Sequence, residues 1–315
     1  MSGETTPGAG DTIEHAPWQG LFDATAPLTA TGNLRRRDIV SRVASGGARV
    51  AAVLALAVLG VVIFAVIKRG GGALSIDFLT KPPPVFGGST GGIGPEIVGS
   101  LIIVGLAAAI ATPVGVLAAL FVTEFAGRRS AQVVRTSLDL MQGLPSIIVG
   151  LLVFGLLVAG VGQSGYAASI ALAIIMLPLI SRASQEVLLL VPNSLREAAD
   201  ALGVPRWRTV VGVVLPEALG GIVTGTILAV GRAAGETAPL IATDSIWNGS
   251  KFAVNPFSHQ GIPNIPFEIF TLSENPDPSS FQRAWGASLV LLMMILLANF
   301  VARALLARNR KRNSR

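Results

Sequence analysis

The chain has 315 residues, of which 51% are hydrophobic and only 13% are charged, and its formal net charge is +6. An ordinary soluble domain carries about 25% charged residues, so this composition argues against a soluble, disordered or coiled-coil protein and indicates a membrane protein. Cysteine is absent and only two histidines occur, so no metal site and no catalytic residue are predicted, and the excess of Lys and Arg is assigned to membrane orientation rather than to nucleic-acid binding.

The first 45 residues form a polar segment that ends in four arginines, Arg35, Arg36, Arg37 and Arg42. A secretory signal would place its apolar core within about the first 15–30 residues, and this segment has no such core. We therefore expect residues 1–45 to be a disordered cytoplasmic tail that precedes a transmembrane domain over residues 46–315.

Six apolar stretches are candidates for helices that cross a bilayer, which need about 20 residues, although the fourth stretch is short. They cover residues 50–67, 97–123, 144–161, 167–180, 218–242 and 284–302. Pro145 and Pro178 are expected to kink or break the third and fourth stretches. The chain is therefore predicted to be an all-α polytopic membrane protein with six transmembrane helices.

The basic residues predict the orientation of these helices. Of the 24 Lys and Arg residues, 18 lie in the two terminal segments and in segments 124–143 and 181–217, whereas only 5 lie in loops 68–96 and 243–283. Because the side rich in Lys and Arg faces the cytoplasm, both termini are predicted to be cytoplasmic and the two long loops external.

A short helix over residues 195–202 is predicted between the fourth and fifth stretches. Ser194 and Glu197 have the spacing of a capping box, in which each side chain satisfies a free backbone N–H group. Four apolar residues at helical spacing form one narrow face: Leu195, Ala198, Ala199 and Leu202. Gly203 and Pro205 predict the end of the helix. This face suits either a groove on another protein or the membrane domain of the same chain.

The wider spacing of this segment resembles the EAA motif of membrane permeases in binding-protein-dependent ABC importers. Glu197-Ala198-Ala199, Gly203 and Leu215-Pro216 match E-A-A-x(3)-G-x(9)-I-x-L-P, with Val213 at the Ile position. The resemblance implies a type I (MetI-like) importer permease fold. It also implies a coupling segment over residues 194–216, in which Glu197, Ala198, Ala199, Leu202 and Gly203 dock into a cytoplasmic ATPase subunit.

The chain has no G-x-x-x-x-G-K-[ST] motif of its own. ATP is therefore expected on partner subunits, and this chain is expected to be a transporter subunit that binds no cofactor, rather than an enzyme.

Two charged residues, Arg232 and Glu236, lie inside the fifth apolar stretch. Ionisable residues at membrane depth are costly and face a bundle interior or a water-filled path, and the i, i+4 spacing places both on one face of a continuous helix. The pair can tie this helix to a neighbour, or it can handle an anion, since the planar fork of Arg suits phosphate or carboxylate oxygens. Glu236 can accept a hydrogen bond from a protonated oxyanion such as hydrogen phosphate, whereas sulfate has no such proton.

The stretch GRAAGETAPLI, residues 231–241, resembles the fifth-helix motif G-R-A-x-G-E-T-A-P of phosphate-specific ABC permeases. The stretches FLTKPPP, GGIGPEIVGSL, GLPSIIVGLLVFG and PFEIF extend this resemblance from about residue 78 to the C-terminus. It implies a permease that moves inorganic phosphate into a bacterial cell through the plasma (inner) membrane, with Arg232, Glu236 and Thr237 on the translocation path.

The same resemblance implies the partners. They are a homologous permease subunit of the PstC type, two ATPase subunits of the PstB type, an external phosphate-binding protein of the PstS type, and membrane lipid. Two alternatives stay open: a permease for another oxyanion such as sulfate or molybdate, and a stand-alone channel or secondary transporter. The GRAAGETAP stretch argues against the first, and the EAA-like helix together with the absence of an obvious inverted repeat argues against the second.

Overall fold

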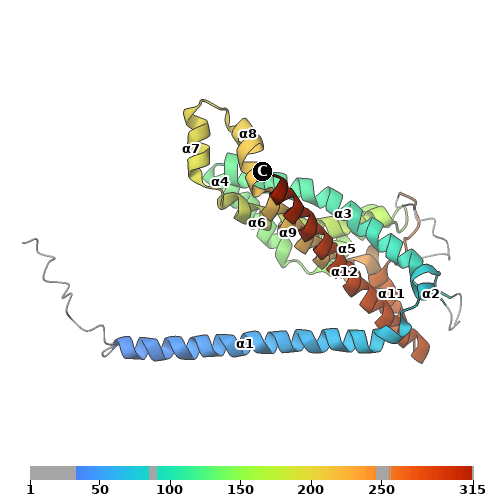
Figure 1. Cartoon of the computed structure of the whole chain (residues 1–315). Helices are drawn as coiled ribbons and strands as arrows, with labels where there is room; N and C mark the ends of the chain where they lie inside the picture. Colours follow the sequence, from blue (N-terminus) through green and yellow to red (C-terminus); the bar gives the residue numbers. More distant parts are fainter. Residues whose placement is uncertain (1–32, 85–90, 246–254, 256, 314–315) are drawn as a thin grey trace, which may run out of the picture. The chain divides into compact units, whose positions relative to one another are not determined.

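The computed structural model describes residues 33–84, 91–245, 255 and 257–313, and all regular structure within them is helical (Figure 1). Two units are each compact, residues 1–61 and residues 62–315. Most of the predicted tail, residues 1–32, lies outside the described residues. Residues 33–45 are helical rather than disordered, because helix α1 runs over Asn33–Gly70.

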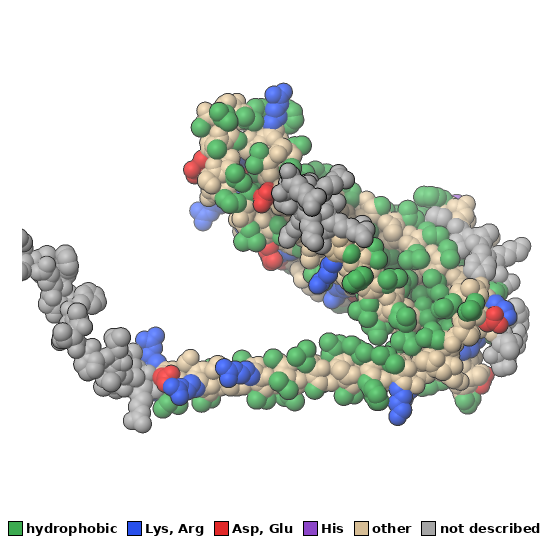
Figure 2. Space-filling model, viewed as in Figure 1, with side chains coloured by type: hydrophobic (Ala, Val, Ile, Leu, Met, Phe, Trp, Pro, Cys, Tyr) green, Lys and Arg blue, Asp and Glu red, His purple; other side chains and the backbone are tan. Residues whose placement is uncertain are grey.

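Five helical stretches are long and apolar enough to cross a membrane. They are Arg36–Ala73, Gly94–Phe125, Gly165–Leu189, Arg206–Ala233 and Pro278–Ala304. A bent pair, α4 (Arg128–Gly143) and a second helix that continues from Ser146 to Val158, counts as a sixth crossing if the two are taken as one span. The predicted stretches 50–67, 97–123 and 284–302 are each confirmed as parts of one long helix, and Figure 2 shows apolar side chains along α1 between basic ends.

The long stretches are built from the following elements: α1, α3 (Gly94–Leu120), η2 (Phe121–Phe125), α6 (Gly165–Leu189), α8 (Arg206–Thr209), η4 (Val210–Val214), α9 (Leu215–Ala233) and α12 (Pro278–Asn313). The remaining elements are η1 (Gly71–Ala73), α2 (Ile76–Thr80), α4, α5 (Ser146–Val153), η3 (Phe154–Val158), α7 (Asn193–Ala201), α10 (Ala238–Thr243) and α11 (Ile265–Glu274).

Two predicted boundaries differ from the observed ones, and one predicted kink is present. The fourth stretch does not end at residue 180, since α6 runs through Pro178 to Leu189. The kink expected at Pro145 is present as a 99° bend between α4 and α5, at the start of the third stretch. The fifth begins at Arg206 instead of residue 218, because the π-helical turn η4 connects α8 to α9 just before Pro216.

The core of residues 62–315 lies where α3, α6 and α9 pack together. Its fully buried side chains are mostly small or flexible, and they include Ala107, Ala111, Leu172, Met176, Ile180, Ala229 and Ala233. Small residues let membrane helices approach closely. At Gly221 of α9, an added Cβ would lie 2.5 Å from the side chain of Val187 on α6, so this close contact between the two helices depends on glycine.

Candidate functional site

The segment that carries Arg232 and Glu236 is broken rather than a continuous helix. Helix α9 ends at Ala233, and α10 begins only at Ala238. The break has a clear cause, because Pro239 has no N–H group and its ring conflicts with the carbonyl group four residues earlier, at Gly235. The prediction that Arg232 and Glu236 lie on one face of a continuous helix is therefore wrong, although the two side chains still meet.

Arg232 and Glu236 form an ion pair across the first turn of this break. The distance from Nη2 of Arg232 to Oε1 of Glu236 is 3.5 Å. The Arg232 side chain is 63% exposed and that of Glu236 is 17% exposed. The guanidinium group carries five N–H donors, so this single long contact leaves most of them available to an anion.

Arg232 lines a cavity of about 400 Å³, and it is the one charged residue among the described residues that line this cavity. The other lining residues come from the α4–α5 turn, from α5 and from α6: Met141, Gln142, Leu144, Pro145, Ser146, Val149, Ile175 and Leu179. Two of these are polar, Gln142 and Ser146. The cavity therefore combines one positive charge, two neutral hydrogen-bonding side chains and an apolar wall, which suits a small oxyanion.

Close packing of α5 on α10 holds the broken segment beside this cavity. A Cβ atom added to Gly150 of α5 would lie only 2.7 Å from Cα of Pro239, so glycine is required for the contact. Thr237 lies in the break immediately before α10, and its carbonyl group accepts a hydrogen bond from the Ile241 N–H group at 3.1 Å. The structure thus pairs Arg232 with Glu236 and places Thr237 directly after Glu236 in the break, while their place on a translocation path stays a prediction.

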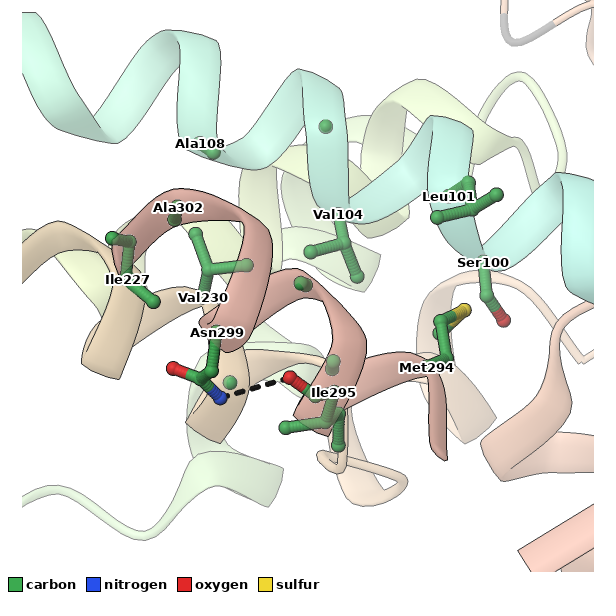
Figure 3. Close-up of a pocket in the computed structure, with 14 residues that line it drawn as sticks. Ser100, Leu101, Val104, Ala108, Ile227, Val230, Met294, Ile295, Asn299 and Ala302 are labelled. Atoms are coloured by element: carbon green, nitrogen blue, oxygen red, sulfur yellow. Dashed lines mark hydrogen bonds between the residues drawn. The ribbon is translucent and has the colours of Figure 1, made fainter. Parts of the chain in front are cut away.

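A second cavity, of about 290 Å³, lies between α3, α9 and α12 (Figure 3). Its lining is almost entirely apolar, and its two polar side chains are Ser100 and Asn299. The Asn299 amide group donates to the carbonyl group of Ile295 in its own helix at 2.9 Å, as Figure 3 shows. This cavity presents no charge to an anion, so the cavity at Arg232 is the better candidate for a translocation site.

Buried polar contacts fix the loop that follows α10. Asp244 is 2% exposed, and its Oδ1 atom accepts a hydrogen bond from the Ile262 N–H group at 2.6 Å. Burial raises the pKa of the Asp244 carboxyl group to about 8, although the hydrogen bonds from Ile262 and Asn264 act in the opposite direction. The Ile265 N–H group donates to Oγ of Ser100 at 2.8 Å, which ties the start of α11 to α3.

The short helix predicted over residues 195–202 is present as α7, but it begins two residues earlier than expected. The helix begins at Asn193 after Pro192, and no side chain caps its first turn, so the capping box of Ser194 and Glu197 is wrong. Pro192 explains the earlier start, since its φ of −58° is already suited to a helix.

The end of α7 is as predicted. Gly203 has a φ of +69°, a left-handed conformation that favours glycine. The Gly203 N–H group donates to the carbonyl group of Asp200 at 3.0 Å, and the Val204 N–H group donates to that of Ala199 at 3.1 Å. These two bonds form a Schellman motif, which satisfies carbonyl groups at the helix end.

The EAA-like residues divide between the two faces of α7. Ala199 is buried, whereas Glu197, Ala198 and Leu202 are exposed, Leu202 to 82%. An apolar side chain this exposed at the tip of a short helix leaves a surface on which another protein can pack.

Sequence reasoning missed the contact that anchors α7. Nη2 of Arg196 lies 2.8 Å from Oε1 of Glu124, and the Glu124 side chain is only 3% exposed. Arg196 also donates to the carbonyl groups of Val191 at 2.7 Å and Leu188 at 3.0 Å. Glu124 lies 72 positions before Arg196, so the only signal in the sequence was a carboxylate at the end of an apolar stretch.

Comparisons with known proteins agree with this geometry. Residues 111–315 match the family described as the binding-protein-dependent transport system inner membrane component. The phosphate transport system permease protein PstA of Yersinia pestis is 37% identical over 257 residues, which cover 79% of this chain and 84% of that protein. PstA of Xylella fastidiosa (strain Temecula1) is 35% identical over 295 residues, which cover 91% of this chain and 99% of that protein. PstA 1 of Mycobacterium tuberculosis (strain H37Rv) is 39% identical over 215 residues, or 67% and 68% of the two chains.

Solved structures show the same fold at low sequence identity. A bacterial alginate ABC transporter in complex with its alginate pentasaccharide-bound periplasmic protein contains a chain with a TM-score of 0.56 and 17% identity, which covers 86% of this chain and 96% of that chain. An inward-facing MetNI methionine ABC transporter gives a TM-score of 0.53 and 19% identity, with 69% and 93% covered. The helices therefore have the arrangement of an ABC importer permease, as predicted.

Proposed function

This chain belongs to the family of binding-protein-dependent transport inner membrane components, together with the PstA permeases, and we propose that it forms part of the membrane pathway of an ATP-driven importer of inorganic phosphate. The observation that carries the substrate assignment is the cavity at Arg232, where a single guanidinium group faces two neutral polar side chains. The names of the relatives support the same substrate.

The pairing of Arg232 with Glu236 suits hydrogen phosphate in particular. The guanidinium group can donate two parallel hydrogen bonds to the oxygens of a tetrahedral anion. Oε1 of Glu236 lies 3.5 Å from Nη2 of Arg232, and on this proposal it accepts the hydrogen bond of a P–OH group of the anion that Arg232 binds. Sulfate has no proton to donate at neutral pH, so the same carboxylate would repel it. Thr237, next to Glu236 in the break, adds a hydroxyl group that can either donate or accept.

The exposed face of α7 supports coupling to a separate ATPase. Leu202 and Ala198 offer apolar surface for a groove, and the bond between Arg196 and Glu124 connects any displacement of α7 to the end of α3 and η2. We propose that α7, with Glu197, Ala198, Ala199, Leu202 and Gly203, docks into an ATPase subunit of the PstB type. The complete importer then has a second permease of the PstC type, two such ATPase subunits and an external binding protein of the PstS type.

Permeases for other oxyanions are the second candidate, because Arg232 alone would also attract sulfate or molybdate. The carboxylate of Glu236 beside Arg232 favours a protonated anion over these two. A stand-alone channel or secondary transporter is disfavoured by the exposed helix α7 and by the family to which the chain belongs.

The test is the uptake of radiolabelled phosphate by proteoliposomes that contain the complete transporter, its binding protein and internal ATP. The double variant Arg232→Gln with Glu236→Gln removes both charges and keeps a polar side chain at each position, with the size of Glu236 unchanged. It also strands neither charge, and replacement of an ion pair by neutral groups is often tolerated structurally. We expect this variant to assemble with its partners and to lose at least about 90% of phosphate uptake, which corresponds to an increase of about 1.4 kcal/mol or more in the activation free energy of transport.

Two outcomes would overturn the proposal. Wild-type vesicles that take up sulfate as fast as phosphate would remove the substrate assignment. Uptake near the wild-type rate in the double variant, at equal membrane abundance, would show that Arg232 and Glu236 are only a structural ion pair.

A further inference from the structure

The α4–α5 turn places two polar side chains in the cavity of Arg232. Gln142 lies in the last turn of α4, and Ser146 is the first residue of α5. Both line the cavity that Arg232 lines. Among the described residues, neither side chain makes a hydrogen bond, whereas many other serines of this chain bond to a backbone carbonyl group of their own helix, as Ser137 does at 3.0 Å.

The position of these two residues depends on the bend rather than on helix propensity. The 99° change of direction between α4 and α5 turns the end of one helix and the start of the next toward α6 and α9. Gly150 lets α5 approach Pro239 closely, and this fixes the turn next to the break that carries Arg232. The sequence alone gave no reason to connect residue 142 with residue 232.

A tetrahedral oxyanion needs more hydrogen-bond partners than Arg232 alone can supply, and neutral polar side chains such as those of Gln142 and Ser146 can supply them. A bidentate Arg satisfies two of the four oxygens, so the other two need donors or acceptors from elsewhere. The Gln142 amide group can donate through its NH₂ group and accept through its oxygen, and the Ser146 hydroxyl group can do either. A translocation site must also release its ion, so neutral partners serve it better than a second cation would.

We propose that Gln142 and Ser146 are specificity-determining residues that complete the oxyanion site at Arg232. They contact the oxygens that the guanidinium group does not reach, and they hold the anion only weakly during its passage. This inference rests on the proposed phosphate transport and assigns further residues to the same site.

The experiment measures phosphate uptake and ATP hydrolysis in the same proteoliposomes of the complete transporter, so that the number of phosphate ions moved per ATP is obtained. Gln142→Leu should lower this ratio about tenfold, because a hydrogen bond to a charged group is lost. Ser146→Ala should lower it about threefold, while Ser146→Thr, which keeps the hydroxyl group, should retain it.

Two matched controls lie on α4, outside the cavity. Gln132 of α4 is exposed and bonds to Thr136 at 3.4 Å, and Ser137 bonds to the carbonyl group of Val133. Gln132→Leu and Ser137→Ala repeat the same chemical changes and should leave the ratio within about twofold of the wild-type value.

The outcomes separate this inference from the proposed function. If wild-type vesicles move phosphate but Gln142→Leu and Ser146→Ala keep the wild-type ratio, then these residues do not contact the substrate. If uptake and ATP hydrolysis fall together at a constant ratio, the residues act in folding or assembly, and the inference also fails. If wild-type vesicles move no phosphate at all, the proposed function itself is wrong.

Discussion

Arg196 connects the proposed coupling helix to the membrane helices. Its guanidinium group reaches one carboxylate oxygen of Glu124 and two backbone carbonyl groups, those of Leu188 at the end of α6 and of Val191 just after it. Oε2 of Glu124 also lies 3.8 Å from Nη2 of Arg206. Glu124 of η2 is thus shared between Arg196 in α7 and Arg206 at the start of α8. Moving either arginine away from η2 would leave this buried carboxylate with less compensation for its charge, which is costly.

Glu124→Gln should loosen α7 without unfolding the membrane helices. The amide group keeps the shape and one acceptor, but the charge-assisted part of the bond to Arg196 is lost. We expect backbone amide exchange over residues 193–204 to become about tenfold faster, while exchange in α3 and α6 stays unchanged. The control is Asp200→Asn, an equivalent loss of charge at an exposed position of α7. Unchanged exchange in Glu124→Gln would show that packing alone holds this helix.

The residues of the candidate site differ in how far the sequence could predict them. The charges of Arg232 and Glu236 stand out against an apolar stretch, and two turns after Ala233, closed by the Gly235 and Glu236 N–H groups, keep the side chains close although the helix ends. Gln142 and Ser146 have no such contrast, because they lie at a polar helix end where Gln and Ser are ordinary. Their role follows only from the bend, which a one-dimensional pattern does not contain.

At the scale of single elements, the end of α7 depends on Gly203. Its φ of +69° is strained for most residues with a side chain, and for β-branched ones above all, although a Cβ atom there would have no neighbour within 4 Å. Gly203→Val should therefore cost about 1–2 kcal/mol through backbone strain alone and should weaken recovery of the ATPase subunit in pull-down experiments, with insertion into the membrane unchanged.

Gly203→Asn provides the comparison, because Asn tolerates the left-handed conformation and should retain most of the recovery. Gly127→Val is the matched control, since Gly127 has a φ of −69° and equally open surroundings. Full assembly and normal transport in Gly203→Val would remove the docking assignment.

The elements that the sequence misplaced share one physical cause. Hydropathy predicts that a segment lies in the membrane, but it does not say whether a proline inside that segment breaks the helix. Pro178 is accommodated in the middle of α6, which neighbouring helices surround, whereas Pro239 follows Gly235 and separates α9 from α10. Neighbouring helices decide which freed carbonyl groups are satisfied, so these two prolines could not be told apart from local sequence.

At the scale of the whole molecule, the distribution of charge predicts one orientation in the membrane. Within residues 62–315, α7 and α8 lie at one end and α2 and α11 at the opposite end, and α12 runs from the second end toward the first (Figure 1). The end with α7 and α8 carries Arg196, Arg206 and Arg208. Since Lys and Arg concentrate on the cytoplasmic side, this end and the C-terminus are expected in the cytoplasm.

Single-cysteine labelling tests this orientation directly, because the chain has no cysteine of its own. Positions within residues 70–90 and 245–280 should react with a membrane-impermeant thiol reagent in intact cells, and Ile76→Cys is a favourable choice because Ile76 is 81% exposed. Positions within 125–140 or after 308 should react only after the membrane is permeabilised, and Gln132→Cys on the exposed surface of α4 serves as the matched site.

The positive-inside rule requires this pattern, since the reverse would move 18 basic residues outside and leave 5 inside. Labelling of Gln132→Cys from outside intact cells would place α7 on the external side, where no ATPase could reach it, and would overturn both the topology and the coupling assignment.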